Sequence, residues 1–505
     1  MLSRNKISGI LFFILLITAL HTAAQVWPRE NAKLNYRIVG FTFPAFDKKG
    51  YILEIAADTY DGVDSFEKHI IIKKSLKGNR MIAEIPFWAN NYTWRIVGKS
   101  GINTQNTLRH FSTGKIPNTD TSFLRLRVVK KAEKHKNAFI FLDANRVLYD
   151  MKGNPVWYLP TVEGLDEKGQ IQKLTDLHTT SQNTITFLSA AGDAYETDYN
   201  GKVLWQKKGD PKTEHGYFHH AFSRLANGHY MIMGTEKVPW VLNKDSSISI
   251  FNEDTKVIAD PTDHIDFGDL IEYDEKGKEV WQWKSSVYYK EFIHTYKDIS
   301  TLPYSDVHAN AFFFDEKNRR IYVSFKNTSQ LLKLTYPGGS VESVYGKPAM
   351  NDNGPAPLFC MQHAITHSPE GYLYLFNNNE CSNSQHPQVV KLEESSKNDL
   401  KLIWAYEYPP DSMYNKIHRQ LKTKKTTNGG NVVELTDHSM FVSFCKPYAN
   451  IFIVSKEKKL LWNAVSEKWS KDLRQWLFEY QYRANIIKDR SELGKLIWKA
   501  EIPVN

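Results

Sequence analysis

The stretch Tyr199-Asn-Gly-Lys-Val-Leu-Trp205 combines a glycine-containing turn with a strand that ends in tryptophan. The chain repeats this pattern six times, at intervals of 48 to 76 residues. The other copies, three of them weaker, end at these aromatic residues: Trp157, Trp281, Tyr345, Trp404 and Trp462. Six β-rich units at this spacing predict a six-bladed β-propeller with about four strands in each blade. A solenoid is the alternative, although its repeats are usually shorter and more regular.

The composition agrees with an all-β protein. Of 505 residues, 41% are hydrophobic, 24% charged and 13% aromatic, which excludes a disordered, collagen-like or coiled-coil chain. The formal net charge of +9 arises from 65 basic and 56 acidic residues, so the basic excess is mild. No basic block alternates with aromatic residues as a nucleic-acid groove would require, and we therefore expect no nucleic-acid partner.

Residues 1–24 have the features of a signal peptide. Arg4 and Lys6 precede an apolar run over residues 7–20, and the small residues Thr22 and Ala24 stand at positions −3 and −1 of a cut before residue 25. That run is shorter than the roughly 20 apolar residues of a membrane-spanning helix. We therefore expect an exported mature chain without a membrane span.

The spacing of strands and turns predicts two domains. Residues 25–115 contain short strands that predict a small N-terminal β-sandwich of immunoglobulin or fibronectin type. A polar linker follows, and residues 123–505 form the predicted propeller domain. Within that domain residues 467–480 have a helix-like pattern, so we expect a C-terminal helical tail packed on the outside of the propeller.

Three cysteines are few for an exported protein of this length. Cys360 and Cys381 could close a loop of about 20 residues, for which chain entropy gives about 3 kcal/mol, and the sequence leaves this pairing open. Cys445 lies in a strand-like run and is expected to be a buried thiol.

A second repeat places histidines in register. His220-Ala and His363-Ala each precede a turn glycine by eight residues, at Gly228 and Gly371, and an apolar strand follows each glycine. A third copy begins with His308-Ala and makes its turn through polar residues. Equivalent positions in different blades lie at equivalent depths around the propeller axis. We therefore expect the three histidines to point into one central site.

Three convergent imidazoles suit two kinds of site. One is a zinc, copper or iron centre, which usually recruits carboxylates that orient the rings. We count no carboxylate beside these motifs, whose polar neighbours are Asn310, Gln362 and residues 377–379. The other is anion chemistry, in which one neutral histidine attacks while the others donate hydrogen bonds to developing negative charge. We expect the second kind of site and no metal.

The ordered stretches Phe218-His-His-Ala221, Asp306-Val-His-Ala-Asn310 and Met361-Gln-His-Ala364 resemble the bacterial arylsulfate sulfotransferase (arylsulfotransferase, ASST-like) family. The resemblance covers roughly residues 25–490. It implies a six-bladed propeller preceded by a β-sandwich, located in the periplasm. It also implies transfer of a sulfuryl group from a phenolic sulfate ester to a phenol by a ping-pong route, without the nucleotide donor PAPS. The chain accordingly has no P-loop motif, and we expect no cofactor.

The resemblance assigns roles to individual residues. His363 matches the family's nucleophile, which carries the sulfuryl group as a covalent intermediate. His308 and Asn310 match residues that bind the sulfuryl oxygens, and His220 matches a histidine that assists proton transfer at the phenolic oxygen. His219 lacks the eight-residue spacing to glycine, so we prefer His220 for this role.

Two further positions carry over less completely. Thr427 corresponds to a substrate-binding threonine or serine of the last blade, although a Gly-rich turn alone explains its surroundings. Lys326 stands where the family has an arginine, in a stretch that we expect to be a strand. Lysine keeps the charge but loses the planar fork that binds two oxygens at once. An exposed strand lysine without a role is the alternative.

Two rival interpretations stay open at this point. The first is a non-catalytic propeller that binds a glycan or a protein, because a fold alone does not determine a function. The second is a metal-dependent enzyme on the same scaffold. The phased histidines favour catalysis, since a binding module has no need of them. The sequence does not identify the donor, the acceptor or the oligomeric state, for which a homodimer is one option.

Overall fold

The structure is a computed structural model of the 505-residue chain. It describes residues 26–100, 107–116, 124–166, 172–210, 212–213, 215–239, 249–252, 255–258, 264–289, 306–346, 357–381, 386–407, 428–445 and 449–501. The signal peptide predicted for residues 1–24 lies outside these ranges. None of the helices within them is long and apolar enough to cross a membrane. The chain divides into two compact units.

The first unit contains the described residues up to 116, residues 156–158 and the end of the chain from residue 493. Its larger sheet has five strands, in the order β1 (Ala32–Leu34), β7 (Arg109–Thr113), β6 (Asn91–Gly98), β3 (Tyr51–Ala57) and β4 (Ile70–Leu76). Its smaller sheet pairs β2 (Ile38–Thr42) with β5 (Arg80–Glu84), and helix α2 (Val63–Lys68) lies between β3 and β4 in the sequence.

Aromatic side chains join the two sheets of this unit. The ring of Phe41 on β2 lies edge-on to Trp94 on β6, with centroids 5.1 Å apart, and to Phe111 on β7 at 6.1 Å. All three side chains are buried. Edge-to-face pairs of this kind add to the stability gained from burial alone. The sandwich of immunoglobulin or fibronectin type stays a prediction.

Six antiparallel sheets, or blades, form the propeller among the described residues, and they belong to the second unit except for residues 156–158 of blade 1. Blade 1 has the strand order β35 (Ala484–Ile487), β9 (Phe139–Leu142), β10 (Val147–Asp150), β11 (Pro155–Tyr158). Blade 2 comprises β12 (Leu174–Thr179), β13 (Ile185–Ser189), β14 (Ala194–Thr197) and β15 (Val203–Lys207). Blade 3 comprises β16 (Phe222–Arg224), β17 (Tyr230–Pro239), β20 (His264–Tyr273) and β21 (Glu279–Lys284), and the hairpin of β18 (Ser249–Asn252) and β19 (Thr255–Ile258) is inserted between β17 and β20 in the sequence.

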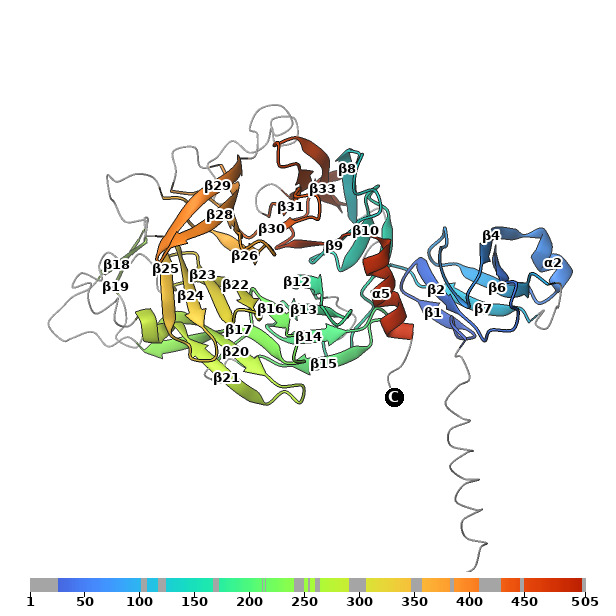
Figure 1. The fold of residues 1–505 in the computed structure, drawn as a ribbon, viewed down its shortest axis with the longest axis horizontal. Coiled ribbons are helices and arrows are strands. Elements are labelled where there is room, and N and C mark those ends of the chain that lie inside the picture. The colour runs from blue at the N-terminus through green and yellow to red at the C-terminus, as the bar shows by residue number, and fades with distance from the viewer. Residues whose placement is uncertain are drawn as a thin grey trace, which may run out of the picture. The chain divides into compact units, whose positions relative to one another are not determined.

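The remaining blades follow in chain order. Blade 4 comprises β22 (Ala309–Asp315), β23 (Arg320–Phe325), β24 (Gln330–Thr335) and β25 (Val341–Tyr345). Blade 5 comprises β26 (His363–His367), β27 (Leu373–Asn377), β28 (Gln388–Ser396) and β29 (Asp399–Glu407). Blade 6 comprises β30 (Asn431–Glu434), β31 (Met440–Ser443), β32 (Asn450–Val454), β33 (Leu460–Ser470) and β34 (Gln475–Phe478). Figure 1 shows the six blades around a common axis, with β12, β16, β22, β26 and β30 toward the centre.

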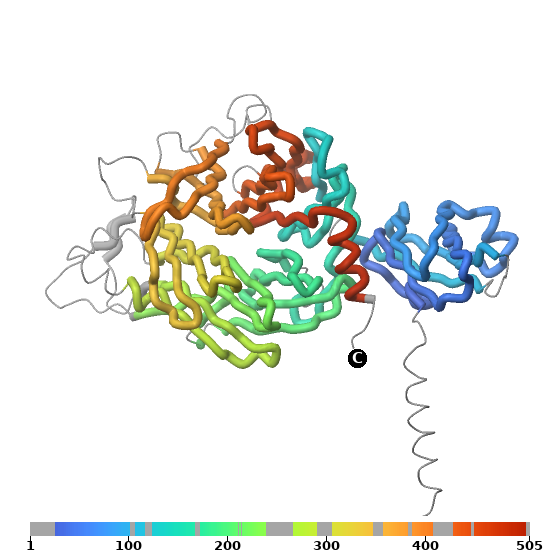
Figure 2. Tube along the Cα trace, viewed as in Figure 1, coloured from blue at the N-terminus to red at the C-terminus, as the bar shows by residue number. Residues whose placement is uncertain are grey.

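Both ends of this unit close the ring. Strand β35, from near the C-terminus, pairs with β9 and so becomes the innermost strand of blade 1. Strand β8 (Leu124–Lys130), which precedes blade 1, pairs with β33 of blade 6. Figure 2 shows these teal and red segments of the chain side by side. Pairing both ends covers strand edges that would otherwise be exposed.

The prediction of an all-β, six-bladed propeller is confirmed. The aromatic residues that ended the sequence repeats all lie on the outer strands β11, β15, β21, β25, β29 and β33. Between neighbouring blades, apolar side chains of one sheet pack on those of the next. Tyr374 and Phe376 of blade 5, for example, share a buried cluster with Val432 and Phe452 of blade 6. Such sheet-on-sheet packing fixes the rotation of each blade relative to its neighbours.

The helix expected over residues 467–480 is wrong. Strands β33 and β34 form a hairpin there, in which Trp469 is opposite Trp476 and their ring centroids are 5.6 Å apart. The guanidinium of Arg125 on β8 lies 3.8 Å from the Trp476 ring. These cross-strand aromatic and cation–π contacts stabilise strands in a segment whose sequence alone looks helical. The C-terminal helix is α5 (Arg490–Glu501), which lies further along the chain.

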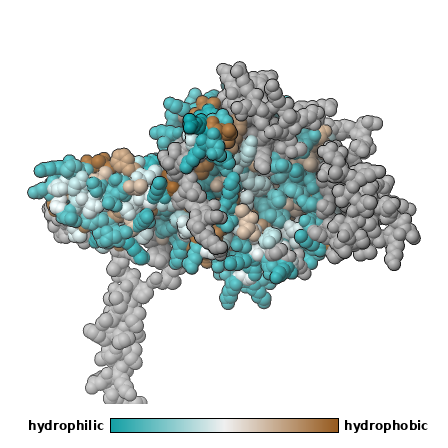
Figure 3. All heavy atoms as spheres, turned by 180° about the vertical axis from the view of Figure 1, so that it is seen from behind, coloured by the Kyte–Doolittle hydropathy of each residue, from teal (hydrophilic) through white to brown (hydrophobic). Residues whose placement is uncertain are grey.

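Hydrophilic residues predominate on the described surface that Figure 3 shows, with small apolar patches between them. This agrees with a chain of which 24% is charged. Large exposed hydrophobic side chains come from several different strands and loops, and single ones are normal on a protein surface.

Candidate active site

The repeated histidines lie where the innermost strands begin. His220 precedes β16, His308 precedes β22, and His363 is the first residue of β26. His220 and His308 have left-handed φ angles of 63° and 58°, which a residue other than glycine seldom adopts. At His363 the ladder between β26 and β27 is irregular, with a register shift before Ile365. His220 and His308 thus share a left-handed backbone, whereas at the third position the left-handed residue is Ala364, which follows His363 and has a φ of 46°.

The structure brings the three histidines together. The ring centroids of His220 and His308 are 5.1 Å apart, and those of His308 and His363 are 6.3 Å apart. The ring of Tyr482 completes the group, at 5.6 Å from His220 and 6.4 Å from His363. Tyr482 is partly buried, with its hydroxyl group inside the protein.

An amide fixes the tautomer of His363. The Nδ1 atom of His363 lies 2.6 Å from Oδ1 of Asn378, whose Nδ2 lies 3.4 Å from the Gly429 carbonyl oxygen and so sets the orientation of the amide. An amide oxygen only accepts hydrogen bonds, so Nδ1 of His363 carries the hydrogen. The Nε2 atom therefore carries the lone pair when the ring is neutral.

His363 is only 2% exposed, and its surroundings keep it neutral. Burial lowers the pKa of this imidazole to about 3, against the opposing effect of the bond to Asn378. The positive charges of Lys326 and Arg483 and the ring of His308 lower that pKa further. A neutral imidazole with a lone pair on Nε2 is the form that a nucleophile requires.

A carboxylate orients His308. Oδ2 of Asp306 lies 2.9 Å from Nδ1 of His308, and Oδ1 accepts a hydrogen bond from the backbone N–H of the same histidine. The expectation that no carboxylate accompanies the histidine motifs is therefore wrong, because Asp306 is close enough in sequence to turn back on His308. No group of three or more potential ligands in the described part of the chain could hold a metal ion. The absence of a metal stays a prediction.

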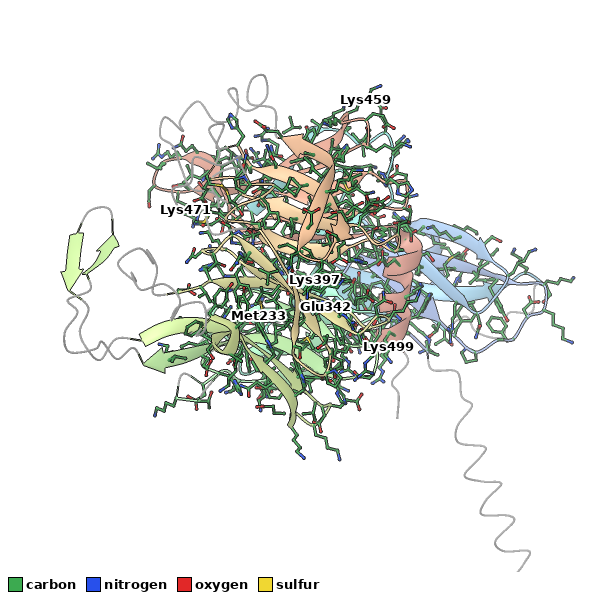
Figure 4. All side chains as sticks on the ribbon, turned by 60° about the vertical axis from the view of Figure 1, so that its left-hand side comes forward. Met233, Glu342, Lys397, Lys459, Lys471 and Lys499 are labelled. Carbon is green, nitrogen blue, oxygen red and sulfur yellow. A yellow bond between two sulfur atoms is a disulfide. The ribbon has the colours of Figure 1, made fainter. Side chains whose placement is uncertain are left out.

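A second imidazole lies behind His220. Nδ1 of His219 is 2.5 Å from Nδ1 of His220, and Nε2 of His219 is 3.0 Å from the Gly234 carbonyl oxygen. The backbone N–H of His219 donates to the carbonyl oxygen of Met233, a residue of β17 that is labelled in Figure 4. Burial lowers the pKa of His219 to about 4, and burial together with neighbouring imidazoles and Arg483 holds the pKa of His220 well below its usual range.

Asn310 contacts the backbone next to the nucleophile. Its side chain is fully buried, and Nδ2 donates to the Gln362 carbonyl oxygen over 2.7 Å, one residue before His363. Its Oδ1 has no hydrogen-bond partner among the described residues. The predicted bond from Asn310 to the sulfuryl oxygens stays a prediction, and the structure gives this amide a contact that positions His363.

Lys326 lies in the turn after β23 and not within a strand as expected. Its backbone N–H donates to the His308 carbonyl oxygen over 2.9 Å, and its Nζ reaches Oδ1 of Asn428, also at 2.9 Å. The Lys326 side chain thus extends from blade 4 to the segment that precedes blade 6. Thr427 lies outside the described residues, so its predicted role has no structural counterpart here.

Sequence reasoning missed an ion pair on the other side of the axis. Nη1 of Arg483 donates to Oδ1 of Asp176 over 2.5 Å, and Nη2 donates to the Asn310 carbonyl oxygen over 3.1 Å. Burial opposes the charge of Arg483, yet Asp176 and the nearby Tyr482 and Asp143 raise its pKa. Arg483 directly precedes β35 and Asp176 is the third residue of β12, so both lie near the start of an innermost strand, as the histidines do in other blades. That approximate correspondence was the available signal, but neither residue begins a His-Ala motif.

A disulfide brackets the nucleophile segment. Cys360 pairs with Cys381, so the pairing that the sequence left open is formed. The backbone N–H of Cys360 donates to Oδ1 of Asn377 over 2.9 Å. The disulfide therefore connects the residues before His363 to the loop after Asn378. Cys445 is a buried free thiol, as predicted.

Several solved structures match this chain at low similarity. A protein of unknown function from Bacteroides caccae is 10% identical, with 72% of this chain and 99% of that chain covered at a TM-score of 0.39. An auxiliary nutrient binding protein from Bacteroides thetaiotaomicron is 9% identical, with 94% and 96% covered at 0.34. The C-terminal WD40 domain of Sif2 is 9% identical, with 72% and 90% covered at 0.34. A search of curated proteins finds no match to this chain.

A sequence model of the family described as "Arylsulfotransferase (ASST)" matches residues 125–401, which is more than half of the chain. The matched segment contains blades 2 to 4, most of blades 1 and 5, and all three histidine motifs. The resemblance seen in those motifs is thereby confirmed, and the chain belongs to the arylsulfotransferase family.

Proposed function

We propose that this arylsulfotransferase-family protein transfers a sulfuryl group from a phenolic sulfate ester to a phenolic acceptor through a sulfurylated His363, without PAPS. The observation that carries the proposal is the state of His363, which is buried and neutral with its lone pair on Nε2. Family membership supports sulfotransfer in general. The export signal and the family resemblance support a periplasmic location.

In the first half-reaction, Nε2 of His363 attacks the sulfur of the donor and the bond from sulfur to the phenolic oxygen breaks. The electron pair of the broken bond leaves with the phenolate. The imidazole keeps its hydrogen on Nδ1, so the sulfurylated ring becomes cationic. Oδ1 of Asn378 accepts the hydrogen bond from that ring, and an acceptor of this kind stabilises the cation.

Charge on the peripheral sulfuryl oxygens has to be stabilised in the transition state. Sulfuryl transfer resembles phosphoryl transfer, in which a loose transition state spreads charge over such oxygens. The positive charges of Lys326 and Arg483 both lower the pKa of His363, so two cations contribute positive potential at this imidazole. Fixed cations in a buried site stabilise such charge without having to reorganise.

In the second half-reaction, a phenol takes the sulfuryl group. The oxygen of the acceptor attacks sulfur as its proton moves to a base, and the bond from sulfur to Nε2 breaks. The electron pair returns to His363, which is neutral again. His220, at 5.1 Å from His308 between the ring centroids, is the histidine that we assign to proton transfer.

Mass spectrometry of the intact protein tests the covalent step. Brief exposure to a chromogenic aryl sulfate alone should add one sulfuryl group, which a phenol should then remove. His363→Asn should abolish this added mass. His367→Asn is the matched control, because His367 lies on the same strand, stacked on Phe313.

Two results would contradict the proposal. His363→Asn that gains the sulfuryl group at the wild-type rate would show that another residue is the nucleophile. Wild-type protein that never gains the group, nor transfers it to any phenol, would favour the glycan- or protein-binding alternative.

A further inference from the structure

We infer that His219 is a positioning residue, which fixes the tautomer of His220 so that Nε2 of His220 is an unprotonated base for the phenolic acceptor. The inference rests on the proposed function for its catalytic consequence. Its structural part concerns only which ring nitrogens carry hydrogens. The sequence repeat did not assign any role to His219.

The contacts of His219 determine its own tautomer. Its Nε2 lies 3.0 Å from the carbonyl oxygen of Gly234 and 2.8 Å from Oγ1 of Thr235. A carbonyl oxygen only accepts, so Nε2 of His219 has to carry the hydrogen at this distance. Nδ1 of the neutral ring is then a lone pair.

The contact between the two rings transfers this constraint to His220. The two Nδ1 atoms are 2.5 Å apart, and a hydrogen bond between them needs one donor and one acceptor. Because Nδ1 of His219 is the acceptor, Nδ1 of His220 carries the hydrogen. Nε2 of neutral His220 then carries the lone pair, beside the rings of His308 and Tyr482.

The electrostatic surroundings favour the neutral form of both rings. Burial is the main reason, and His308, His363 and Arg483 also oppose a positive charge on His220. Asp306 has the opposite effect on His219 but does not outweigh burial. His220 thus has a neutral imidazole behind it, whereas His308 has the carboxylate of Asp306. At rest His220 is therefore a proton acceptor and not a proton donor.

The acceptor half-reaction uses this state directly. Nε2 of His220 takes the proton of the phenol while the phenolic oxygen forms its bond to sulfur and the bond from sulfur to His363 breaks. His220 becomes a cation that still donates from Nδ1 to His219. The proton is then lost to solvent, because the site disfavours the charge.

The donor half-reaction lacks an equivalent proton donor at rest. The donor's phenolate therefore has to leave as an anion, without a proton from the enzyme. This is easiest for acidic phenols, because their phenolates are the most stable. We therefore expect sulfate esters of acidic phenols as donors, and a rate of His363 sulfurylation that falls steeply as the pKa of the leaving phenol rises.

Nitrogen-15 NMR of the histidine rings tests the structural part in the whole protein. Hydrogen on Nδ1 of His220 and on Nε2 of His219 is the expected result. Hydrogen on Nε2 of neutral His220 would overturn the inference whether or not sulfotransfer occurs. This readout does not depend on activity, so it separates a failure of the inference from a failure of the proposed function.

Single-turnover transfer from sulfurylated enzyme to a phenol tests the catalytic part. His219→Asn keeps an acceptor near the position of Nδ1 and should retain most of the rate, whereas His219→Leu should lose at least tenfold, within the range of general-base catalysis. His219→Asp places a carboxylate behind His220 and should move the acid limb of the transfer rate to higher pH. His229→Asn, in the same blade and bonded to Glu272, is the matched control.

The outcomes are distinct. Wild-type rate and pH profile in both His219→Leu and His219→Asp would overturn the inference while leaving the proposed function intact. Wild-type enzyme that is never sulfurylated would overturn the proposed function and this catalytic role with it. If His219→Leu does not fold, the comparison of His219→Asp with His219→Asn still decides, because only the carboxylate should shift the pH profile.

Discussion

The two sides of the propeller axis use residues near the start of the innermost strands for different purposes. On one side, blades 3 to 5 contribute His220, His308 and His363 at the start of their innermost strands. On the other side, blades 1 and 2 contribute Arg483 and Asp176, which form a buried ion pair. Asp176 has a left-handed φ of 56°, close to the 63° of His220 and the 58° of His308. The fold thus repeats the geometry, while the residue type decides the chemistry.

The difference between the two sides has an electrostatic consequence. Arg483 lowers the pKa of His220 and of His363, so the charged side helps to keep the histidine side neutral. Asp176 holds the guanidinium in place, and Asn310 links it to the backbone before His363. A neutral nucleophile beside a fixed cation is what attack on an anionic sulfate ester requires. The ion pair is therefore part of the site and not only of the core.

The largest expected effect comes from breaking this ion pair. Arg483→Met should lower the free energy of unfolding by about 3–5 kcal/mol, because it leaves the buried carboxylate of Asp176 without its partner. Denaturant unfolding followed by circular dichroism measures the loss. The double variant Arg483→Met with Asp176→Leu removes both charges and should recover part of the stability.

A loss below about 1 kcal/mol in Arg483→Met would contradict the assignment, since surface substitutions have effects of that size. The matched control is Arg127→Met, because Arg127 is more exposed, and its partner Glu467 also accepts from Arg125.

The second effect concerns the cation on the histidine side. Lys326→Ala should lower kcat/KM and leave the fold intact. The fall should correspond to a loss of about 2–4 kcal/mol of transition-state stabilisation, which is the range for removing one preorganised donor. Lys326→Arg should keep or raise the activity, because the guanidinium can form two parallel bonds where the ammonium forms one. Steady-state kinetics with an aryl sulfate measures both variants.

Lys317→Ala is the control for this prediction, because Lys317 is an exposed turn residue of the same blade. Equal kinetics in Lys326→Ala and Lys317→Ala would mean that Lys326 is a solvated residue without a role, which the sequence left as an alternative.

The comparison of the two sides also explains what the sequence could predict. His220, His308 and His363 carry a shared His-Ala motif, so their phase was visible and their convergence followed from blade symmetry. Arg483 and Asp176 lie near the start of innermost strands without any motif, and only the closure of blade 1 by β35 brings Arg483 to the axis. Such a contact between residues 307 positions apart leaves no local pattern.

Local patterns also misled in identifiable ways. Residues 467–480 look helical by composition, but Trp469 and Trp476 pair across a hairpin, and tertiary contacts override weak propensity. The carboxylate behind His308 was two residues away in the sequence, yet only the left-handed backbone at His308 turns it toward Asp306. The strands that carry the repeated motifs were predictable because apolar alternation and turn glycines act over a few residues.

A third prediction concerns the partner of the nucleophile. Asn378→Asp replaces the amide oxygen at Nδ1 of His363 with a carboxylate, which favours the charged ring. The pKa of His363, about 3 in the wild type, should rise by about 1 unit or more. The acid limb of the sulfurylation rate should move up by the same amount, which a pH series of single-turnover measurements detects. An unmoved limb would mean that this bond does not control the proton on His363.

The smallest expected effect is on how the free energy of unfolding depends on pH. Burial holds the pKa of His363 at about 3, below the 6.5 of an exposed histidine. Between these two values the unfolded chain binds a proton that the folded chain does not, so the free energy of unfolding falls as the pH falls. The slope for one proton is about 1.4 kcal/mol per pH unit.

Other groups act in the same range, so the wild type alone does not isolate this slope. His219, with a pKa of about 4, and His220, whose pKa is also lowered, add to it. His110 and His215 have raised pKa values, so their contribution falls at higher pH. The difference between His363→Asn and wild type cancels these shared contributions. That difference in the free energy of unfolding should move in favour of the variant by about 1.4 kcal/mol for each pH unit between pH 6 and pH 4. A constant difference across this interval would mean that folding does not lower the pKa of His363, which would contradict the buried imidazole with a lowered pKa on which the nucleophile assignment rests.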